Sequence, residues 1–436
     1  MNNFSDVHYA ILRLLAGCGW VSHTMLELTG YSYSYRTRSL KLLLDQQFIR
    51  KQGQGKNKAY TLTAKGRNHL AGFSAHRFRE EVMAETKQLS RHPERAVLRG
   101  DTAAMLSFAG FSIHMDDKPD LPVTTPPLPE SPSPEDWKHL FQNSGFFSYA
   151  GEIDRKVYTR RTSAVGCYYD ATAIKELAGR CGLDIAGIGY SRACGVLMTP
   201  SSLLRVYHSR DVAMKFQVTG ERNLQNLLLS SLVLTGYRPP ETGAALIFGT
   251  DFTAAAHILD NHSGGPAQQP VYAKRKGRKG YAAISGSTGE LLQPTNLGNP
   301  AYYLPLCRDS LTLLELMHYS MWKEMLIREI SRELFQLENN TRWTFELDGC
   351  TVYLLVCLNL PQIDLTLRKI RAAPHQWARI ICLDWQEPLF RRLLEPYAKD
   401  RDIRLTRLPA AYMEDLSERI KRCWEECYGE DKRTNS

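Results

Sequence analysis

The chain has 436 residues, a net charge of +9 and an apolar content of 43%, so we expect two or three domains with substantial hydrophobic cores. It contains no run of 18 uninterrupted apolar residues, which argues against a transmembrane helix, and residues 1–6 lack the basic and apolar regions of a signal peptide. The ten cysteines are scattered, with no Cys-x-x-Cys pair, and we interpret them as reduced, mostly buried thiols of a cytoplasmic protein.

The positive charge is concentrated near the N-terminus. Residues 1–70 hold ten lysines and arginines against three acids, a net charge of +7, so the other 366 residues together carry only +2. A polyanion is the natural partner of such a segment, because each phosphate contact releases condensed counterions. We therefore expect nucleic acid as the partner, the alternative being a basic surface that serves protein contact.

The same segment has the element order of a winged helix-turn-helix. Its predicted elements are, in chain order, a helix over 6–16, a short helix from Ser22, a turn at Gly30, a longer basic helix over about 33–46, a β-hairpin pairing 48–51 with 59–62, and a further helix capped by Thr63. The glycines of the hairpin tip supply the positive φ angles that such a turn needs.

The long helix is expected to have two different faces. Leu40, Leu43 and Leu44 repeat at helical spacing and should pack inward. Recognition helices use the N-terminal part of their outer face to reach base edges and phosphates in the major groove. The residues predicted to contact DNA are Ser34, Tyr35, Arg36, Arg38, Ser39 and Lys41 of this helix and Lys51, Gln54, Lys56, Asn57 and Lys58 of the wing.

Composition divides the rest of the chain. The predicted organisation is a winged helix-turn-helix domain over 1–72, a helical connector over 73–115, a proline-rich linker over 116–134 and an α/β domain over 135–430. The connector is polar, with sparse apolar positions, and is expected to bridge domains or to pair with a second subunit. Seven prolines between 116 and 134 favour an extended spacer.

The C-terminal part of the α/β domain alternates strands with helices. The predicted elements are strands over 351–358, 378–383 and 403–408, helices over 362–371 and 388–394, and a closing helix over 413–427. Such alternation is typical of a parallel sheet covered by helices. We therefore predict a βαβαβ unit over 350–410.

An earlier stretch raises the possibility of a restriction-endonuclease-like nuclease. The predicted order there is a helix over 170–179, strands over 193–198, 203–208 and 212–216, a helix over 221–234 and a strand over 244–248. Asp211 and Lys215 bracket the third strand and Glu176 lies on the helix, but four residues along a strand span about 13 Å, too far for a shared metal site. We therefore predict a nuclease-like scaffold with no catalytic residue, no metal and no cofactor.

Other motifs carry little chemistry. The chain has no phosphate-binding Gly-x-x-x-x-Gly-Lys, no His-Glu-x-x-His and no Gly-x-Ser-x-Gly. The basic stretch over 274–279 is expected to be an exposed loop that either touches phosphates or is simply solvated.

Parts of the chain resemble a known family. The winged-helix ending Tyr-Thr-Leu-Thr-Ala-Lys-Gly-Arg (60–67) is common to many bacterial DNA-binding proteins. The segments Ser-Arg-Ala-Cys-Gly-Val-Leu-Met-Thr-Pro (191–200), Val-Tyr-His-Ser (206–209) and Met-Lys-Phe (214–216) resemble the replication-relaxation family of plasmids and integrative elements of Gram-positive bacteria. The resemblance covers roughly the first 250 residues and transfers no catalytic residue.

The resemblance implies a mobile-element protein that binds double-stranded DNA and acts in replication, in DNA relaxation or in mobilisation by conjugation. We expect a cytoplasmic homodimer, with a relaxase or replication proteins as possible partners and no membrane contact. A transcriptional regulator whose α/β domain senses a ligand or partner is the second interpretation, and a divergent nuclease is the third.

Overall fold

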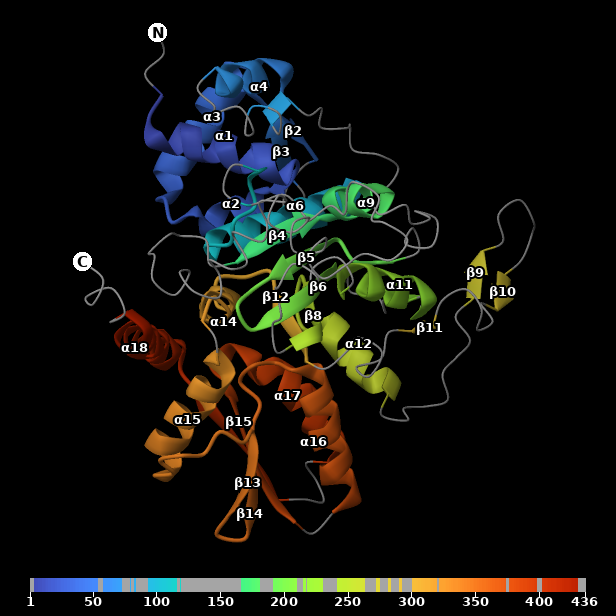
Figure 1. Cartoon of the computed structure of the whole chain (residues 1–436), viewed down its shortest axis with the longest axis vertical. Coiled ribbons are helices and arrows are strands. Elements are labelled where there is room, and N and C mark those ends of the chain that lie inside the picture. The colour runs from blue at the N-terminus through green and yellow to red at the C-terminus, as the bar shows by residue number, and fades with distance from the viewer. Residues whose placement is uncertain are drawn as a thin grey trace, which may run out of the picture.

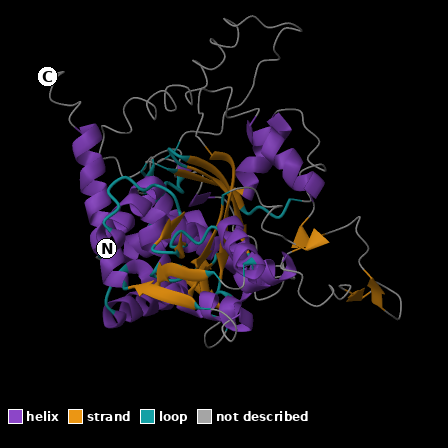
Figure 2. Cartoon of the chain, turned by 90° about the horizontal axis from the view of Figure 1, so that it is seen from below, coloured by secondary structure: helices purple, strands orange, loops and turns teal. Residues whose placement is uncertain are grey.

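The computed structural model describes residues 4–53, 58–72, 79, 82–83, 93–115, 118, 166–180, 191–209, 215–216, 218–229, 241–262, 272–274, 281–283, 290–291, 300–319, 321–373, 376–397 and 402–429. Within these residues the chain is a mixed α and β structure with several sheets. Figure 1 shows the N-terminal elements at one end of the long axis, a five-stranded sheet near the middle and a four-stranded sheet at the other end. Seen from below, helices flank the strands on both sides (Figure 2).

Helices and a small antiparallel sheet form the N-terminal end. The elements are α1 (Asp6–Cys18), β1 (Val21–Ser22), α2 (His23–Leu26), the 3-10 turn η1 (Glu27–Thr29), α3 (Tyr33–Asp45), β2 (Ile49–Gln52), β3 (Ala59–Leu62) and α4 (Ala64–Ala71). The strand order is β1-β3-β2 and both pairings are antiparallel. The predicted helices and hairpin are therefore observed, and Thr63 caps α4 as expected, its Oγ1 accepting the Gly66 N–H at 3.1 Å.

Helix α1 holds this end together. Its apolar side chains recur at helical spacing, so that Val7, Ile11 and Leu15 are buried on one face. That face packs against α3, α4 and β3. Gly30, after η1, has a φ of 77°, a left-handed conformation that favours glycine, and it turns the chain from α2 and η1 into α3.

Helix α6 (Pro93–Phe108) lies between the N-terminal end and the five-stranded sheet (Figure 1). It contacts α1, β1 and α2, and also α14 (Ser310–Leu316) and β6 (Ser202–His208). Ala104, Met105 and Leu106 in its second half are fully buried. Residues 93–108 of the predicted connector are thus helical and pack inside their own chain. The predicted linker over 116–134 falls outside the described residues, apart from Lys118.

The five-stranded sheet mixes antiparallel and parallel pairing. Its elements, with the helices that connect them, are β4 (Cys167–Asp170), α9 (Ala171–Arg180), β5 (Gly195–Met198), β6, α11 (Val218–Leu228), β8 (Glu241–Gly249), α12 (Thr253–His262) and β12 (Ala301–Pro305). The strand order is β12-β8-β6-β5-β4, with β4, β5 and β6 antiparallel and β6, β8 and β12 parallel. Two small pairs lie outside this sheet: β7 (Lys215–Phe216) with β11 (Glu290–Leu291), and β9 (Tyr272–Lys274) with β10 (Tyr281–Ala283).

The order predicted from the sequence, a helix, three strands, a helix and a strand, is observed as α9, β5, β6, β7, α11 and β8. Two of its three strands form the β5–β6 hairpin, and the predicted strand over 244–248 lies within β8. The third predicted strand, over 212–216, is described only as β7, which pairs with β11 and not with the hairpin. After β6 the chain passes through α11 to β8, which lies parallel beside β6. Within the described residues the third strand of this order therefore lies outside the five-stranded sheet.

The C-terminal unit confirms the predicted alternation of strands and helices. Its elements are α15 (Trp322–Phe335), β13 (Thr344–Leu347), β14 (Cys350–Leu354), α16 (Leu360–Ala372), β15 (Trp377–Leu383), η5 (Asp384–Gln386), α17 (Glu387–Leu394), η6 (Glu395–Tyr397), β16 (Ile403–Leu408) and α18 (Ala410–Gly429). Strands β14, β15 and β16 are parallel, and β13 adds an antiparallel edge that the sequence did not predict.

One buried apolar cluster runs from Val7 in α1 to Ile420 in α18. The two larger sheets meet where the loop after β14 reaches β12: the Tyr303 N–H donates to the Leu358 carbonyl at 3.1 Å, and the Ala301 N–H donates to Asn359 Oδ1 at 3.0 Å. The predicted domain boundaries stay predictions. None of the helices in the described ranges is both long and apolar enough to cross a membrane.

Candidate nucleic-acid interface

Helix α3 presents a polar and basic face to solvent. Ser32 caps the helix by accepting the Tyr35 N–H at 3.4 Å. Behind the cap, Leu40 and Leu43 are buried, which fixes the rotation of the helix about its axis. The exposed side chains in the first two and a half turns, which we term the outer face of α3, are Tyr33, Ser34, Tyr35, Thr37, Arg38 and Lys41.

Four of the six helix residues predicted to contact DNA lie on this outer face, and two do not. Arg36 is only 5% exposed and Ser39 only 1%, so the expectation that they face outward is wrong. Their positions explain it: Arg36 precedes Leu40 by four residues and Leu43 by seven, which is the spacing of one helix face. The buried leucines thus place Arg36 on the inner face of the helix despite its charge.

Arg36 bonds to the chain that leads into α3. Its Nη2 lies 3.4 Å from Glu27 Oε1, and its Nη1 donates to the Tyr31 carbonyl at 3.4 Å. The guanidinium carbon also lies 5.7 Å from the centre of the Tyr33 ring. Arg36 therefore connects η1, the turn and α3, and it is in no position to read a base.

The two exposed residues that sequence reasoning missed are Tyr33 and Thr37. Tyr33 is 67% exposed at the first position of α3, and Thr37 lies one turn later, directly before Arg38. The spacing of four residues from Tyr33 to Thr37 and from Thr37 to Lys41 was the available signal. Together with Arg38 they offer hydroxyl, aromatic and cationic groups on one surface.

The predicted wing, the β2–β3 hairpin, is described at its two strands. Lys51 on β2 is exposed, Lys58 before β3 is half-buried, and Gln54, Lys56 and Asn57 lie outside the described residues. Arg50 is half-buried over the Trp20 ring, 5.4 Å from its centre. Of the two described side chains of this hairpin that were predicted to contact DNA, Lys51 is thus the more exposed.

His23 lies where α2 meets the β2–β3 hairpin. Its Nδ1 lies 3.4 Å from the Tyr60 hydroxyl, and its backbone N–H donates to the Lys58 carbonyl at 2.8 Å. Burial is the main cause that lowers the pKa of His23, with a smaller opposing effect of Glu27. Burial likewise raises the pKa of Tyr60. The pair is therefore neutral near pH 7 and serves to hold α2 against β3.

Of the residues considered for a nuclease site, the structure describes two, and they lie on different elements. Glu176 is exposed on α9, Lys215 lies in the short strand β7, and Asp211 is outside the described residues. The part of the chain that the structure describes contains no group of three or more His, Cys, Asp or Glu side chains able to hold a metal ion. Most of the basic stretch over 274–279 also lies outside the described residues.

The five-stranded sheet instead carries a buried polar network that the sequence did not predict. Glu221, on α11 and 1% exposed, accepts hydrogen bonds from the Tyr207 hydroxyl at 2.6 Å and from the Ser191 hydroxyl at 3.1 Å. It also accepts the Arg192 N–H at 2.6 Å and lies 4.0 Å from the buried Arg205 guanidinium. Burial raises the pKa of Tyr207 well above its ordinary value. This network fixes the chain entering β5 and gives no exposed reactive group.

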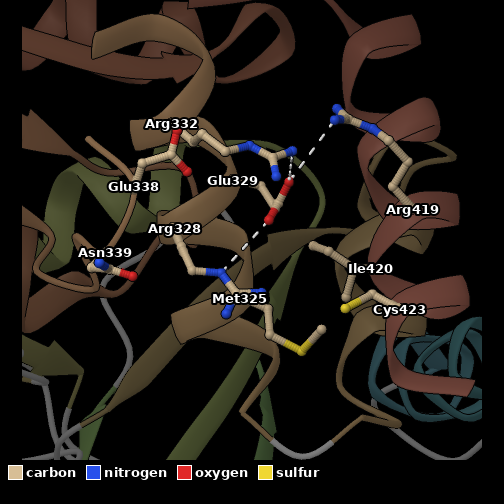
Figure 3. Close-up of a pocket in the computed structure, with 9 residues that line it drawn as sticks. All are labelled: Met325, Arg328, Glu329, Arg332, Glu338, Asn339, Arg419, Ile420 and Cys423. Carbon is tan, nitrogen blue, oxygen red and sulfur yellow. Dashed lines mark hydrogen bonds and ion pairs between the residues drawn. The ribbon is translucent and has the colours of Figure 1, made fainter. Parts of the chain in front are cut away.

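A cavity of about 400 Å³ lies between α15 and α18 (Figure 3). Glu329 stands among three guanidiniums: it pairs with Arg332, and lies 3.6 Å from Arg328 Nε and 4.0 Å from Arg419 Nη1. Arg419 also bonds to Glu333, and this contact is the main cause that lowers the pKa of Glu333. Met325, Ile420 and Cys423 supply apolar lining. The arginines are thus largely neutralised by acids of the chain itself.

Comparisons of the chain with known protein families, with characterised proteins and with solved structures found no match.

Proposed function

We propose that the chain is a sequence-specific double-stranded DNA-binding protein whose N-terminal end is a winged helix-turn-helix. The observation that carries the proposal is the outer face of α3, where Arg38 and Lys41 reach solvent one turn apart while Leu40 and Leu43 are buried behind them. In this arrangement α2, the turn at Gly30 and α3 form the helix-turn-helix, and the β2–β3 hairpin is the wing.

The division of charge supports a polyanionic partner. The segment of 70 residues that contains α3 and the wing carries +7 of the total +9. Phosphate contacts by such a segment account for affinity, and contacts from α3 to base edges account for specificity. Arg38 suits bidentate contact with guanine, Lys41 and Lys51 suit phosphates, and Ser34 and Thr37 are able to contact either.

For the biological role we propose replication or mobilisation of a plasmid or an integrative element. The support is the resemblance of 191–200, 206–209 and 214–216 to the replication-relaxation family. A homodimer bound to a repeated site, together with a relaxase or a replication protein, is the assembly that fits this role. No cofactor is part of the proposal.

A transcriptional regulator with a ligand-sensing α/β body is the second candidate. The cavity between α15 and α18 favours it, because about 400 Å³ is within the size range of small-molecule sites and its lining combines charged and apolar side chains. The two candidates differ in the DNA they bind: replication predicts sites near an origin, and regulation predicts sites in the promoters of the element itself.

The test is a fluorescence-anisotropy titration with duplexes selected from a random library. The variant Arg38→Ala/Lys41→Ala is compared with Arg404→Ala/Lys369→Ala, which removes the same two charge types from exposed positions on β16 and α16. We expect selection to yield a defined sequence, the α3 variant to lose it, and the control to bind like the wild type. Failure to select any sequence, or equal losses in both variants, would overturn the proposal.

A further inference from the structure

We propose that helix α6 sets the orientation of the DNA-reading helices relative to the rest of the chain, and that Asp101 is the positioning residue. The effect on DNA binding rests on the proposed function, whereas the contacts of α6 do not depend on it. Asp101 lies on α6, 79 positions along the chain from Ser22, the residue it contacts.

The contact joins a buried carboxylate to the first residue before α2. Asp101 is 6% exposed, and its Oδ1 accepts the Ser22 N–H at 2.7 Å. Burial is the main cause that raises the pKa of this carboxyl to about 6, and the hydrogen bonds from Ser22 partly oppose the rise. An apolar side chain would fill this position at a lower free-energy cost, because a buried acid has to be desolvated. The carboxyl is therefore there for its hydrogen bond.

Ser22 is the point where three elements meet. Its Oγ caps α2 by accepting the Met25 N–H at 3.0 Å. As the last residue of β1 it is opposite Ala59 of β3, next to the wing. A hydrogen bond that holds the Ser22 backbone therefore fixes the start of α2 and the inner edge of the wing sheet at once.

The residue before Asp101 brings the two backbones together. A Cβ atom at Gly100 would lie far inside contact distance of the Trp20 carbonyl oxygen and also too close to the Cys18 carbonyl oxygen. Glycine is thus required for α6 to approach the end of α1 and the start of β1. Gly100 allows α6 to lie close to β1. The hydrogen bond between Asp101 and Ser22 then fixes the position of β1 along the helix.

The other end of α6 is attached to the α/β body. The ring of His318, in the turn after α14, is hydrogen-bonded through Nε2 to the Ala109 carbonyl at 2.7 Å and stacks on Phe111 with ring centres 4.1 Å apart. Ser112 then pairs with β4: its N–H donates to the Gly166 carbonyl, and its carbonyl accepts the Tyr168 N–H, both at 2.9 Å. One short helix thus spans from Ser22 to the five-stranded sheet.

A shift at either end of α6 is transmitted to the other, because both ends are held by hydrogen bonds and close packing. The outer face of α3 follows, since α3 is bonded to η1 through Arg36 and η1 continues α2 without a break. DNA affinity should therefore depend on Asp101 although this residue is buried and touches no DNA.

The experiment compares Asp101→Ala and Asp101→Asn with the wild type and with Glu221→Gln. Glu221 is the matched control, because it is a buried, hydrogen-bonded acid on α11, away from the N-terminal end. Affinity for the selected duplex is measured at a temperature where circular dichroism shows every variant to be folded. A residue that only stabilises the fold does not change affinity under that condition, whereas a positioning residue does.

We expect Asp101→Ala to weaken binding about tenfold, Asp101→Asn to stay within about threefold because its amide oxygen still accepts the Ser22 N–H, and Glu221→Gln to bind like the wild type. Amide hydrogen exchange provides a readout without DNA: exchange over 22–26 should speed up in Asp101→Ala while β6 and β8 stay protected.

Unchanged affinity and unchanged exchange in folded Asp101→Ala overturn the inference. So does an equal loss of affinity in Glu221→Gln, since that would reflect general stability. Should the wild type bind no duplex, the proposed function fails, and exchange over 22–26 alone decides whether α6 positions α2.

Discussion

Arg36 Nη2 lies 3.4 Å from Glu27 Oε1, and this ion pair joins α3 to the 3-10 turn that precedes it. The Arg36 side chain is 6% exposed and that of Glu27 is 46% exposed, so the cation is enclosed while the carboxylate remains in contact with solvent. The Arg36 bond to the Tyr31 carbonyl spans the same turn. These contacts fix how α3 leaves the turn, and they keep Arg38 and Lys41 pointing outward.

Arg36 and Arg38 are therefore expected to behave differently when replaced by alanine. Arg36→Ala should lower the free energy of unfolding by about 1–3 kcal/mol, because it removes a buried side chain and leaves the Tyr31 carbonyl without its donor. Arg38→Ala should change stability by less than about 0.5 kcal/mol but weaken specific DNA binding by about 1–3 kcal/mol. Urea unfolding and anisotropy titrations check the two effects. Loss of stability in Arg38→Ala with none in Arg36→Ala would contradict the assignment.

Lys51 is expected to contact phosphate and not bases. It is exposed on β2, and lysine makes point-charge contacts without the planar fork that arginine brings to guanine. Lys51→Ala should weaken binding to specific and random duplexes by a similar factor, and should reduce the slope of log affinity against log salt by about 0.9. Lys369→Ala, an exposed lysine on α16, serves as the control. An unchanged slope would mean that Lys51 does not touch DNA, and a loss of discrimination would mean that it reads sequence.

How far the sequence predicts this structure depends on the range of the interactions. The alternation over 351–408 is local and periodic, and the βαβαβ unit is observed as expected. The N-terminal helices and hairpin are equally local, and their positions were also predicted. Gly30 and Thr63 have the local roles, a turn and a cap, that their residue types indicate.

The contacts that could not be predicted join residues far apart in sequence. Asp101 and Ser22 are 79 positions apart, and His318 and Ala109 are 209 apart. Nothing periodic links such pairs, so α6 was interpreted as a connector and not as a packed core helix. The inward direction of Arg36, in contrast, could have been predicted from the sequence. Its spacing of four and seven residues from Leu40 and Leu43 places it on the buried face of the helix, although an arginine is usually expected at the surface.

The buried Asp101 carboxyl should make stability depend on pH. Its pKa rises from the ordinary 3.8 to about 6 in the folded chain, mainly because of burial. The folded state then holds the proton more tightly than the unfolded state, so the contribution is favourable below pH 4 and is lost as pH rises to 6. The full difference is about 3 kcal/mol.

Asp101→Asn isolates this effect from that of the histidines. Burial lowers the pKa of His318, so this group has the opposite effect. Its contribution to the stability of the folded chain is lost as the pH falls below 6.5. The histidines are the same in the wild type and in Asp101→Asn, so their contribution cancels in the difference between the two unfolding free energies. That difference, measured by urea unfolding, should fall as the pH rises from about 4 through 6 and be constant above about pH 7. A difference that is flat over the whole range would show that Asp101 titrates normally.

Gly100→Ala should separate α6 from β1. Alanine in the interior of a helix usually stabilises it by up to about 1 kcal/mol relative to glycine, but at Gly100 the added methyl would collide with the Trp20 and Cys18 carbonyl oxygens. We therefore expect a net loss of about 1–3 kcal/mol in the free energy of unfolding, together with faster amide exchange at Ser22. Gly243→Ala is the control, because there the nearest atom is the end of the flexible Gln225 side chain at 3.4 Å. A stabilised Gly100→Ala would show that α6 does not need this close approach, and the role of Asp101 in setting the register of α2 would then lose its structural basis.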